Sequence, residues 1–449
     1  MPKCSLISLG CNKNLVDSEV MLGRLKDYEL TNTTQEADII IINTCGFIAS
    51  AKKESIDKIL EVVSDKKDDA ILVVSGCLSE RYTNELRDEI PEIDIIMGVG
   101  DYDKIDSIIN SHNAKKPKIS VESPQNSPLV IKTNRTFLID SQSRIITGSK
   151  IHTYIKISEG CNQQCSFCAI PHFKGKLRSR SLESIMKEID ILLENGFCDI
   201  SFIAQDSSSY MHDFGKKDAL IELIKNVEKS GIKSARINYL YPNSTNDKLI
   251  ATIAESNVFQ NYFDMPIQHI TDSMLKTMRR RADKRRHIEL LRQMRACENS
   301  FIRTTFLLGH PNESERDFEE LCEFVSEFAF DRANIFAFSK EEGTTAFKMA
   351  NEVDKKITKS RIKSLNAILK NQQENSFKSL VGRKIPVIID GLSEQSPLLF
   401  SGRDVRWDRE IDGEILINDS NIAVKIGYYE AEITDFKGGF LLGRVIRAI

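Results

Sequence analysis

The sequence predicts an α/β protein of three domains: an amino-terminal parallel-sheet domain, a central partial barrel of six strand-helix units, and a small carboxy-terminal antiparallel β-barrel. Three patterns in the 449 residues lead to this prediction. Two separate series of apolar runs alternate with amphipathic stretches, which is typical of parallel sheets, and a last series of short β-rich runs is broken by Gly, Asp and Asn turns. The expected domains are 2–112, 147–377 and 378–449, with a linker at 113–146.

The amino-terminal domain is predicted from four apolar runs, each followed by an amphipathic stretch. The expected strands are CSLISLG, ADIIIIN, AILVVSG and IDIIMG, and the expected helices are residues 14–28, 48–64, 79–90 and 101–111. Strands that alternate with helices form a parallel sheet with right-handed crossovers. After residue 112 the chain turns polar, loses its periodicity and contains Pro117, Pro124 and Pro128, which indicates a linker or an irregular hairpin.

The central domain is predicted from a second alternating series. Its expected strands are HTYIKIS, CDISFIA, KSARINYLY, NYFDMPI, FIRTTFLLG and RANIFAFS. Six units are fewer than the eight of a closed barrel of this class, so we expect an open, partial barrel. The terminal domain is predicted from the runs KIPVIID, EILIND, AVKIGYYEAEITDF and FLLGRVI, whose lengths and turn residues are typical of a small β-barrel.

Composition and net charge exclude several classes of function. The chain has 62 Lys and Arg against 65 Asp and Glu, so its net charge of -3 gives no overall attraction for nucleic acid. The amino terminus has neither a basic start nor an apolar stretch with a cleavage site, and no apolar run reaches membrane-spanning length. We therefore expect a cytoplasmic protein with no membrane partner. In that compartment, metal binding, catalysis or burial explains ten cysteines better than disulfides do.

Three cysteines are concentrated in one short segment. Cys161, Cys165 and Cys168 have C-x3-C-x2-C spacing and directly follow the first strand of the central domain, where the catalytic loops of a strand-helix barrel emerge. Iron-sulfur clusters and zinc both select thiolate ligands. A four-iron cluster on three thiolates would leave one iron open to an outside ligand, as in open catalytic metal sites. The alternatives are a closed zinc site with His172 as the fourth ligand and three cysteines that bind no metal.

A second set of three cysteines is predicted from topology. Cys11, Cys45 and Cys77 each lie at the carboxyl end of a predicted parallel strand, and those ends share one edge of the sheet, where ligands bind. Each has a glycine beside it, which would let the backbone approach a bulky cofactor: Gly10, Gly46 and Gly76. The alternative is three inert buried thiols. The remaining cysteines lie inside strand or helix patterns and are predicted to be packing residues: Cys4, Cys198, Cys297 and Cys322.

A family resemblance is carried by the segment YIKISEGCNQQCSFCAIPHFKGKLRSRSLESI, which resembles the S-adenosylmethionine radical enzymes. Together with the three amino-terminal cysteines, it makes the whole chain similar to the methylthiotransferases of that group. The resemblance implies an amino-terminal methylthiotransferase domain, a radical core and a terminal barrel of the TRAM type. The segments SLGCNKNLVDSE and NTCGFIASAKKESI are similar to the members that modify an aspartate of a small-subunit ribosomal protein. Other members modify an adenosine of transfer RNA.

The resemblance also implies the cofactors. In the family, a 4Fe-4S cluster held at the positions of Cys161, Cys165 and Cys168 binds S-adenosylmethionine and cleaves it to a radical that abstracts hydrogen from carbon. A second 4Fe-4S cluster, at the positions of Cys11, Cys45 and Cys77, carries or supplies sulfur, and a second S-adenosylmethionine gives the methyl group. The implied reaction is methylthiolation of the β carbon of an aspartate, with an electron donor protein as a partner.

Other positions near strand ends are less specific. Gln205 and Asp206 follow the second strand of the central domain and are candidates for contact with cofactor or substrate, although a polar turn would look the same. His310 and Asn312 stand where the family commonly has an aromatic residue and a glycine. This departure leaves the shape of that loop open, but neither residue is a predicted cluster ligand.

The distribution of charge along the chain bears on the class of substrate. The basic run 278–295 suits a solvated face, phosphate contacts or an acidic protein loop, so it does not discriminate. Residues 380–449 hold nine Lys or Arg and eleven Asp or Glu, whereas an RNA-binding barrel should be positive. This balance favours a ribosomal protein or an assembly intermediate as the partner, with direct nucleic acid binding not required. The acids expected to dock it are Asp404, Asp408, Glu410, Asp412 and Glu414. The alternatives to this function are the same chemistry on a transfer RNA and a non-enzymatic iron-sulfur or zinc protein.

Overall fold

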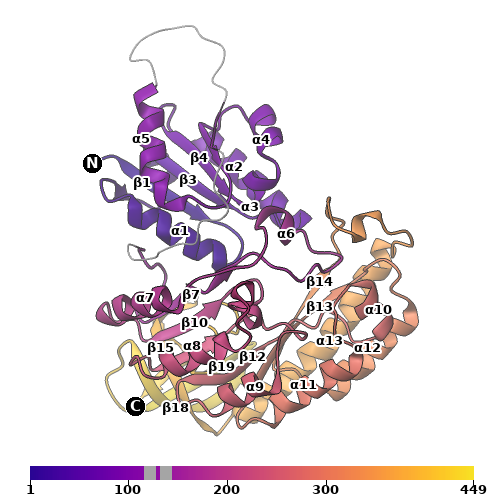
Figure 1. Ribbon diagram of the computed structural model, residues 1–449. Coiled ribbons are helices and arrows are strands. Elements are labelled where there is room, and N and C mark those ends of the chain that lie inside the picture. Colours follow the sequence, from indigo (N-terminus) through magenta and orange to yellow (C-terminus); the bar gives the residue numbers. More distant parts are fainter. Residues whose placement is uncertain (116–127, 132–143) are drawn as a thin grey trace.

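The computed structural model describes residues 1–115, 128–131 and 144–449. These residues form two six-stranded sheets, a closed five-stranded barrel and a two-stranded ribbon (Figure 1). The three main sheets correspond to the three predicted parts of the chain, so the predicted fold class is confirmed. The exact domain boundaries stay a prediction, because most of the expected linker at 113–146 lies outside the described residues.

The amino-terminal sheet is parallel throughout. Its strands, in spatial order, are β2 (Glu29–Leu30), β1 (Lys3–Ser8), β3 (Ile39–Thr44), β4 (Ile71–Gly76), β5 (Ile95–Met97) and β6 (Leu129–Ile131). β3 and β4 are buried along their whole length, because helices cover both faces of the sheet. β6 pairs with β5 from within the expected linker, where three residues are too few to produce a strand pattern.

The helices of this domain divide their apolar residues between the two faces of the sheet. Helices α1 (Asn12–Arg24) and α5 (Ile105–Lys115) pack with Ile39 and Ile41 on one face. Helices α2 (Ala49–Asp65), α3 (Cys77–Arg81) and α4 (Thr83–Glu89) pack with Ile40 and Ile42 on the other. This is the alternation that successive strand residues impose. Two short 3-10 turns complete the domain: η1 (Thr34–Glu36) and η2 (Tyr102–Lys104).

The central sheet is an open, partial barrel of six parallel strands, as predicted. Its order is β14 (Arg332–Ala337), β13 (Phe301–Leu308), β12 (Phe259–Asp264), β11 (Ser234–Ile237), β10 (Asp199–Ile203) and β7 (His152–Lys156). The helices that pack on it are α7 (Leu182–Glu194), α8 (Ala219–Val227), α9 (Asp247–Ala254), α10 (Asp272–Thr277), α11 (Lys284–Ala296), α12 (Glu315–Glu327) and α13 (Lys355–Leu380). Short elements in the loops are β8 (Ser158–Glu159), α6 (Ile170–Phe173), β9 (Arg178–Ser179), η3 (Ser207–Ser209), η4 (His212–Phe214) and η5 (Ala346–Lys348).

The terminal domain is a closed barrel. Its strands are β15 (Lys384–Ser393), β16 (Ser396–Asp404), β17 (Ile415–Ser420), β19 (Phe440–Ala448) and β18 (Gly427–Lys437), in that spatial order. Neighbouring strands of the barrel pair antiparallel, except β17 and β19, which pair in parallel. β16 was not predicted, because SPLLFSGRD has a proline at its second position and lacks the alternation that marks the other strands.

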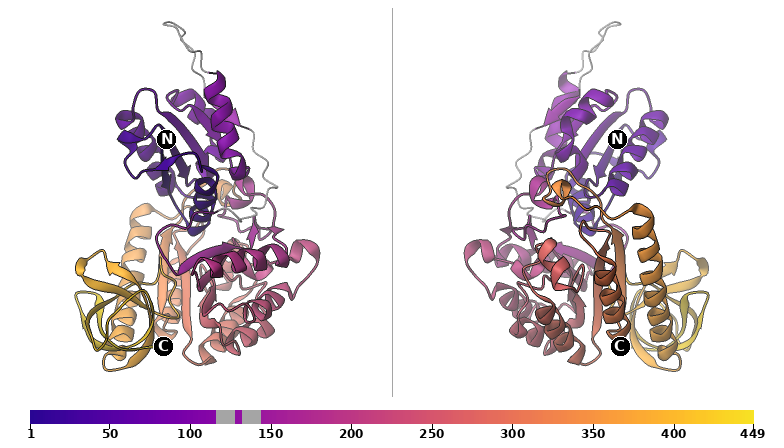
Figure 2. Two further views of the ribbon diagram at one scale, coloured as in Figure 1. Left: turned by 90° about the vertical axis from the view of Figure 1, so that its left-hand side faces the viewer. Right: turned by 90° about the vertical axis from the view of Figure 1, so that its right-hand side faces the viewer.

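The barrel docks on the central domain through buried charge, and it lies away from the amino-terminal domain (Figure 2). Asp199, the first residue of β10, accepts from Arg236 at 2.9 Å and from Arg403 of the barrel at 2.6 Å. Asp408 accepts from Tyr154 Oη at 2.6 Å and from Asn238 Nδ2 at 2.9 Å. The 403–412 segment is therefore a buried contact between the domains.

This contact corrects the expected role of the barrel's acids. Asp404, Asp408 and Asp412 are at most 2% exposed, and Asp404 pairs with Arg406 of its own loop. The expectation that these three face a basic partner is wrong, because all three are buried, and Asp408 and Asp412 contact the central domain instead. Of the five acids, Glu410 is exposed and Glu414 is half-buried. No helix among the described residues is long and apolar enough to cross a membrane.

Candidate active site

The Cys161–Cys168 loop follows β8 and is closed by its own backbone. Cys161 N–H donates to Gly175 O at 3.1 Å, and Cys168 N–H donates to Cys165 O at 3.1 Å. Gly160 has a φ of +79°, and a Cβ there would lie 2.1 Å from Lys176 O, so this position requires glycine. The three cysteine side chains are neither fully buried nor fully exposed. The loop thus follows the carboxyl end of β7, and the role of its thiols as cluster ligands stays a prediction.

Polar side chains from other strand ends hold this loop. Asp206 is 1% exposed and accepts from Gln163 Nε2 at 2.7 Å, while also accepting from Ser209 and Ser244. Gln205 donates to Glu159, just before the loop. The two residues thus contact the loop and its approach. Their predicted contact with cofactor or substrate is not tested by these hydrogen bonds.

His310, which the sequence marked only as a departure from the family pattern, also supports the loop. Its Nδ1 lies 2.9 Å from Pro311 O, an atom that can only accept, so Nδ1 carries the proton. Its Nε2 is then the acceptor for the Ser166 hydroxyl at 3.0 Å. Burial lowers the pKa of His310, which favours this neutral form. The loop is thus tied to the end of β13.

Cys11, Cys45 and Cys77 converge at the carboxyl ends of β1, β3 and β4, which are neighbours in the sheet. A Cβ on Gly10 would lie 2.9 Å from Cys45 Sγ, and a Cβ on Gly46 would lie 2.8 Å from the Cys77 backbone. The glycines were predicted to admit a cofactor, whereas here they let the three loops approach one another. Asn14 ties these loops together, because its Nδ2 donates to Leu9 O and Thr44 O, both at 3.0 Å.

Burial keeps most of these thiols protonated in the metal-free protein. The pKa of Cys45 is raised to about 11 and that of Cys77 to about 12; burial is the largest cause, and the neighbouring thiols of the set contribute to the rise. Burial likewise raises the pKa of Cys161 to about 12 and raises that of Cys168, each with a contribution from Cys165. A metal that binds these thiolates must therefore displace their protons.

The two cysteine sets lie on elements that pack together. Cys77 shares one apolar cluster with Ala169 and Phe173, which directly follow the Cys161–Cys168 loop. A segment after β14 bridges the same two regions: Ala346 N–H donates to Ser166 O at 2.8 Å, and Glu341 binds Lys52 at 2.8 Å and Arg81 at 2.9 Å. Arg81 in turn donates to Gly46 O at 2.6 Å. The elements that carry the two predicted ligand sets thus pack against each other.

A buried ion network links α1, which follows Cys11, to the residues on either side of the Cys161–Cys168 loop. Lys156, the last residue of β7, binds Asp17 of α1 and, at 2.7 Å, Glu159. Lys174 lies 3.4 Å from Asp17 and 3.5 Å from Glu159. Burial opposes the charge on Lys174, but Glu159 and the other anions around it raise its pKa well above the usual value. Burial would likewise raise the pKa of Glu159, but Lys156 and Lys174 lower it.

The zinc alternative gains no support from His172. The His172 ring lies beside Gly343, where a Cβ would be 3.6 Å from its Nε2. Within the described ranges, no group of three or more His, Cys, Asp or Glu side chains is placed to hold a single metal ion. A four-iron cluster differs in this respect, since each thiolate binds its own iron and the three need not meet at one point. None of the ten cysteines, all of which are described, forms a disulfide.

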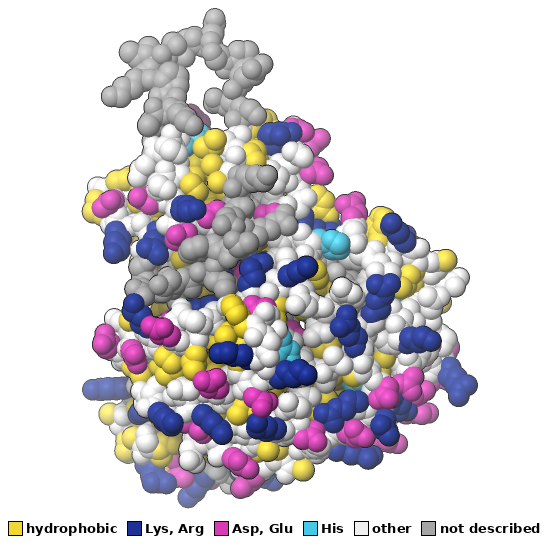
Figure 3. All heavy atoms as spheres, viewed as in Figure 1, with side chains coloured by type: hydrophobic (Ala, Val, Ile, Leu, Met, Phe, Trp, Pro, Cys, Tyr) yellow, Lys and Arg dark blue, Asp and Glu magenta, His cyan; other side chains and the backbone are white. Residues whose placement is uncertain are grey.

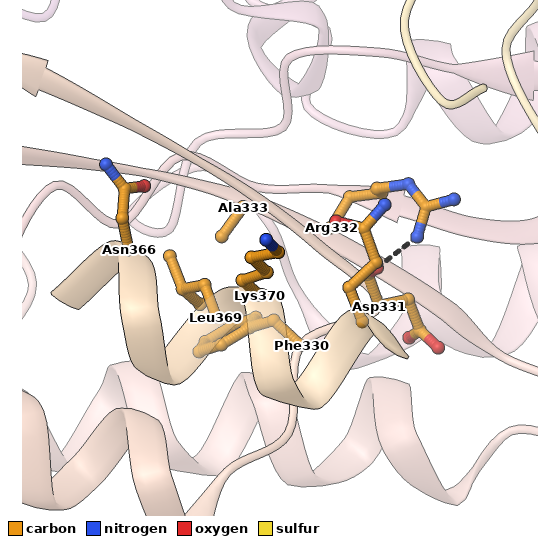
Figure 4. Close-up of a pocket in the computed structure, with 8 residues that line it drawn as sticks. Phe330, Asp331, Arg332, Ala333, Asn366, Leu369 and Lys370 are labelled. Carbon is orange, nitrogen blue, oxygen red and sulfur yellow. Dashed lines mark hydrogen bonds between the residues drawn. The ribbon is translucent and has the colours of Figure 1, made fainter. Parts of the chain in front are cut away.

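A pocket of about 260 Å³ lies elsewhere, between β14 and α13 (Figure 4). Phe330 and Leu369 form its apolar side, and Asp331, Arg332 and Lys370 its charged rim. It contains none of the predicted site residues. On the face shown in Figure 3, Lys and Arg side chains are interspersed with Asp and Glu, so this face has no single sign of charge.

Comparison with known proteins assigns the chain to a family. Residues 3–98 match the model of uncharacterized protein family UPF0004, and residues 155–325 match the radical SAM superfamily. A protein of Wolinella succinogenes, named ribosomal protein uS12 methylthiotransferase RimO, is 54% identical over 99% of this chain and 98% of its own. A protein of the same name from Helicobacter pylori strain Shi470 is 55% identical over 98% and 97%. The chain belongs to the RimO family of methylthiotransferases.

The solved structures agree with this membership at the level of the fold. The radical S-adenosylmethionine methyltransferase TsrM from Kitasatospora setae, with cobalamin and a [4Fe-4S] cluster bound, superposes with a TM-score of 0.54. The match covers 75% of this chain and 72% of that one at 14% identity, so it shows the fold alone. As a radical SAM enzyme of the RimO family, the chain uses S-adenosylmethionine and iron-sulfur chemistry.

Proposed function

We propose that this chain adds a methylthio group to the β carbon of an aspartate in ribosomal protein uS12. The observation that carries the proposal is the 54–55% identity, over nearly the whole chain, with proteins named for that reaction. The packing of Cys77 against Ala169 and Phe173 supports it, because sulfur transfer needs the two cysteine sets close together. The substrate is the ribosomal protein or an assembly intermediate, an electron donor protein is the second partner, and nucleic acid contact is not required.

The proposed cofactors are two 4Fe-4S clusters and S-adenosylmethionine. Cys161, Cys165 and Cys168 would hold the cluster that binds S-adenosylmethionine, and the amino-terminal set would hold the other: Cys11, Cys45 and Cys77. When bound, these groups supply radical generation, sulfur and, from a second S-adenosylmethionine, the methyl group. Three thiolates per set leave room for an outside ligand on each cluster.

The chain's own residues orient and shield this chemistry. Asp206, through Gln163, and His310, through Ser166, fix the loop that carries the radical-site thiols. We assign Gln205 the same orienting role, through Glu159. The cluster of Cys77, Ala169 and Phe173 excludes water between the two sets, as a reaction through a carbon radical requires. The thiols must release protons as they bind iron, so assembly should be favoured at higher pH.

The proposal predicts a division of labour between the sets. Cys165→Ala should abolish reductive cleavage of S-adenosylmethionine, because it removes one of three thiolates from the radical site. Cys77→Ala should spare at least part of the cleavage and stop methylthio transfer. The measurement is 5'-deoxyadenosine release, together with mass spectrometry of uS12 for an added methylthio group, in anaerobically reconstituted protein.

Iron content and substrate choice complete the test. The parent protein should hold about eight irons and eight sulfides per chain, as two four-iron clusters require. Cys4→Ala, a change at a buried thiol in the amino-terminal core, is the matched control and should leave the iron content unchanged. Methylthiolation of transfer RNA in place of uS12, or equal loss of cleavage in both cysteine variants with the radical cluster intact, would contradict the proposal.

A further inference from the structure

The basic run after α10 contains one buried arginine between two exposed ones. Arg280 is 4% exposed, whereas Arg279 and Arg281 are exposed. Helix α10 ends in a Schellman arrangement: Arg280 N–H donates to Leu275 O at 2.9 Å, and Arg279 takes the left-handed position, with φ +56°, where glycine is usual. Arg281 is also left-handed, with φ +61°. Two unfavourable backbone conformations thus flank the one arginine that is buried.

Arg280 reaches the radical-site loop. Its Nη1 donates to Cys165 Sγ at 3.4 Å, and its Nη2 donates to Pro266 O. The guanidinium lies over the ring of Tyr241, 4.2 Å from its centroid. Tyr241 Oη donates to Arg280 O at 3.1 Å and lies 3.6 Å from Cys165 Sγ. The side chain is thus fixed on both sides, and one of its donors is committed to the thiol.

A third donor of this guanidinium has no partner within the described chain. Arg280 Nε is buried and makes no hydrogen bond to any described residue. Buried donors are usually satisfied, so this N–H is available to an acceptor that is not part of the chain. Arginine stays protonated in proteins, so burial here places a permanent positive charge beside Cys165.

We propose that Arg280 is a positioning residue of the radical site, which fixes Cys165 Sγ and stabilises the reduced form of the cluster by its charge. The proposal rests on the function proposed above, since it requires Cys165 to be a cluster ligand. Reduction takes one electron from the donor and adds one negative charge to the cluster. A fixed cation in contact with a cluster thiolate would stabilise that added charge and therefore raise the reduction potential.

The test is a redox titration of the reconstituted full-length protein, followed by electron paramagnetic resonance. The radical cluster is identified as the one whose signal changes when S-adenosylmethionine is added. Arg280→Met removes the charge, and Arg280→Lys keeps it while losing the planar fork. Arg285→Gln is the matched control, because it removes one charge from the same run at a side chain that is 85% exposed.

Arg280→Met should retain iron but lower the midpoint potential. At the potential where the parent cluster is half reduced, the ratio of reduced to oxidised cluster should fall about tenfold, the scale of a nearby charge under strong screening. Arg280→Lys should stay near the parent, and Arg285→Gln should match it. If Arg280→Met loses the cluster, the test rests on Arg280→Lys. A midpoint potential equal to that of the parent in Arg280→Lys supports the proposal, and loss of the cluster in this variant as well overturns it.

Two further results would overturn the inference. Equal shifts in Arg280→Met and Arg280→Lys would mean that packing, not charge, sets the potential. An unchanged potential in Arg280→Met, with the cluster intact, would mean that the charge is irrelevant. The proposed function fails in a different way: the parent protein itself would then show no signal that responds to S-adenosylmethionine, and the inference would fall with it.

Discussion

The central domain makes two interfaces from the same kind of interaction, at opposite ends of its strands. Toward the amino-terminal domain, Lys156 at the carboxyl end of β7 binds Asp17. Toward the terminal barrel, Asp199 at the amino end of β10 binds Arg236 and Arg403. All five side chains are almost fully buried. Buried ion pairs alone therefore do not reveal what an interface is for.

What distinguishes the two interfaces is their surroundings. The Asp17 network includes Glu159 and Lys174, which flank the Cys161–Cys168 loop in the sequence. It therefore helps to fix where one cysteine set lies relative to the other. The Asp199 network lies beside barrel residues such as Trp407 and Asp408, and no predicted ligand takes part in it. We therefore expect a substitution in the Asp17 network to uncouple S-adenosylmethionine cleavage from methylthio transfer. A substitution in the Asp199 network should instead weaken the packing of the barrel on the central domain.

The largest effect is expected from Asp199→Asn. It leaves Arg236 and Arg403 buried without their shared carboxylate, and breaking a buried pair in this way costs about 3–5 kcal/mol. The chain's single tryptophan, Trp407, is 1% exposed at this interface and reports on it directly. Urea titration of the metal-free protein, followed by Trp407 fluorescence, should show a transition at a much lower urea concentration than in the parent.

A surface pair provides the control for that experiment. Asp218 and Lys248 form an ion pair in which both side chains are more than half exposed. Asp218→Asn should change stability by about 0.5 kcal/mol or less, since exposed pairs contribute little. If Asp199→Asn fell within about 1 kcal/mol of the parent, the buried network would not be what holds the barrel.

The next effect is expected at the other interface, from Asp17→Asn. Lys156 and Lys174 keep Glu159 as a partner, so the loss of stability should be smaller, about 1–3 kcal/mol. The expected signature is uncoupling: 5'-deoxyadenosine is still released, but the methylthiolated product per deoxyadenosine falls about tenfold, as a misplacement near 1 Å can cause. Both products are measured by mass spectrometry in the same reaction.

The matched control is Asp57→Asn, a change at an exposed pair with Lys53 on helix α2. It should leave the product ratio and the Trp407 transition as in the parent. Asp17→Asn should also leave the Trp407 transition nearly in place, because the barrel lies at the other end of the core. A parallel loss of both products would mean that Asp17 supports folding alone.

The sequence predicted the parts of the molecule that depend on local pattern. The Cys161–Cys168 loop could be recognised directly, and the Cys11, Cys45 and Cys77 set followed from the rule that parallel strand ends share an edge. β6 and β16 were missed because one is three residues long and the other lacks alternation. Pattern therefore predicts which elements exist better than it predicts short or irregular additions to a sheet.

The side chains around the site could not be predicted in the same way. Lys156 meets Asp17 across 139 residues, and Arg280 meets Cys165 across 115. Such pairs depend on how domains dock, which no local pattern encodes. The same limit explains the error over Asp404, Asp408 and Asp412: a charge count treats every acid as exposed, whereas docking buries these three. The correction removes the charge argument for a basic partner and leaves the choice of substrate to family membership.

The smallest effect, and the one that tests the barrel interface most selectively, is its dependence on pH through Asp412. Burial raises the pKa of Asp412 from 3.8 to about 7; Asp408 also raises it, and Arg303 and Arg332 lower it. The folded protein therefore binds this proton more tightly than the unfolded chain does. Between about pH 4 and 7 this group makes stability fall as pH rises, and above pH 7 its contribution is constant.

Asp412→Asn should remove that dependence, because the amide resembles the neutral acid at every pH. Buried histidines titrate in the same range with the opposite sign, since burial lowers the pKa of His152 and His269 to about 4. The useful quantity is thus the difference in unfolding free energy between Asp412→Asn and the parent, in which the histidine contributions cancel. This difference should grow in favour of the variant from pH 5 to 7, by at most about 1.4 kcal/mol per pH unit for one proton. Followed through Trp407 fluorescence, a difference that stays flat over that range would show that Asp412 is ionised in the folded protein, and that the barrel interface carries its full charge at every pH.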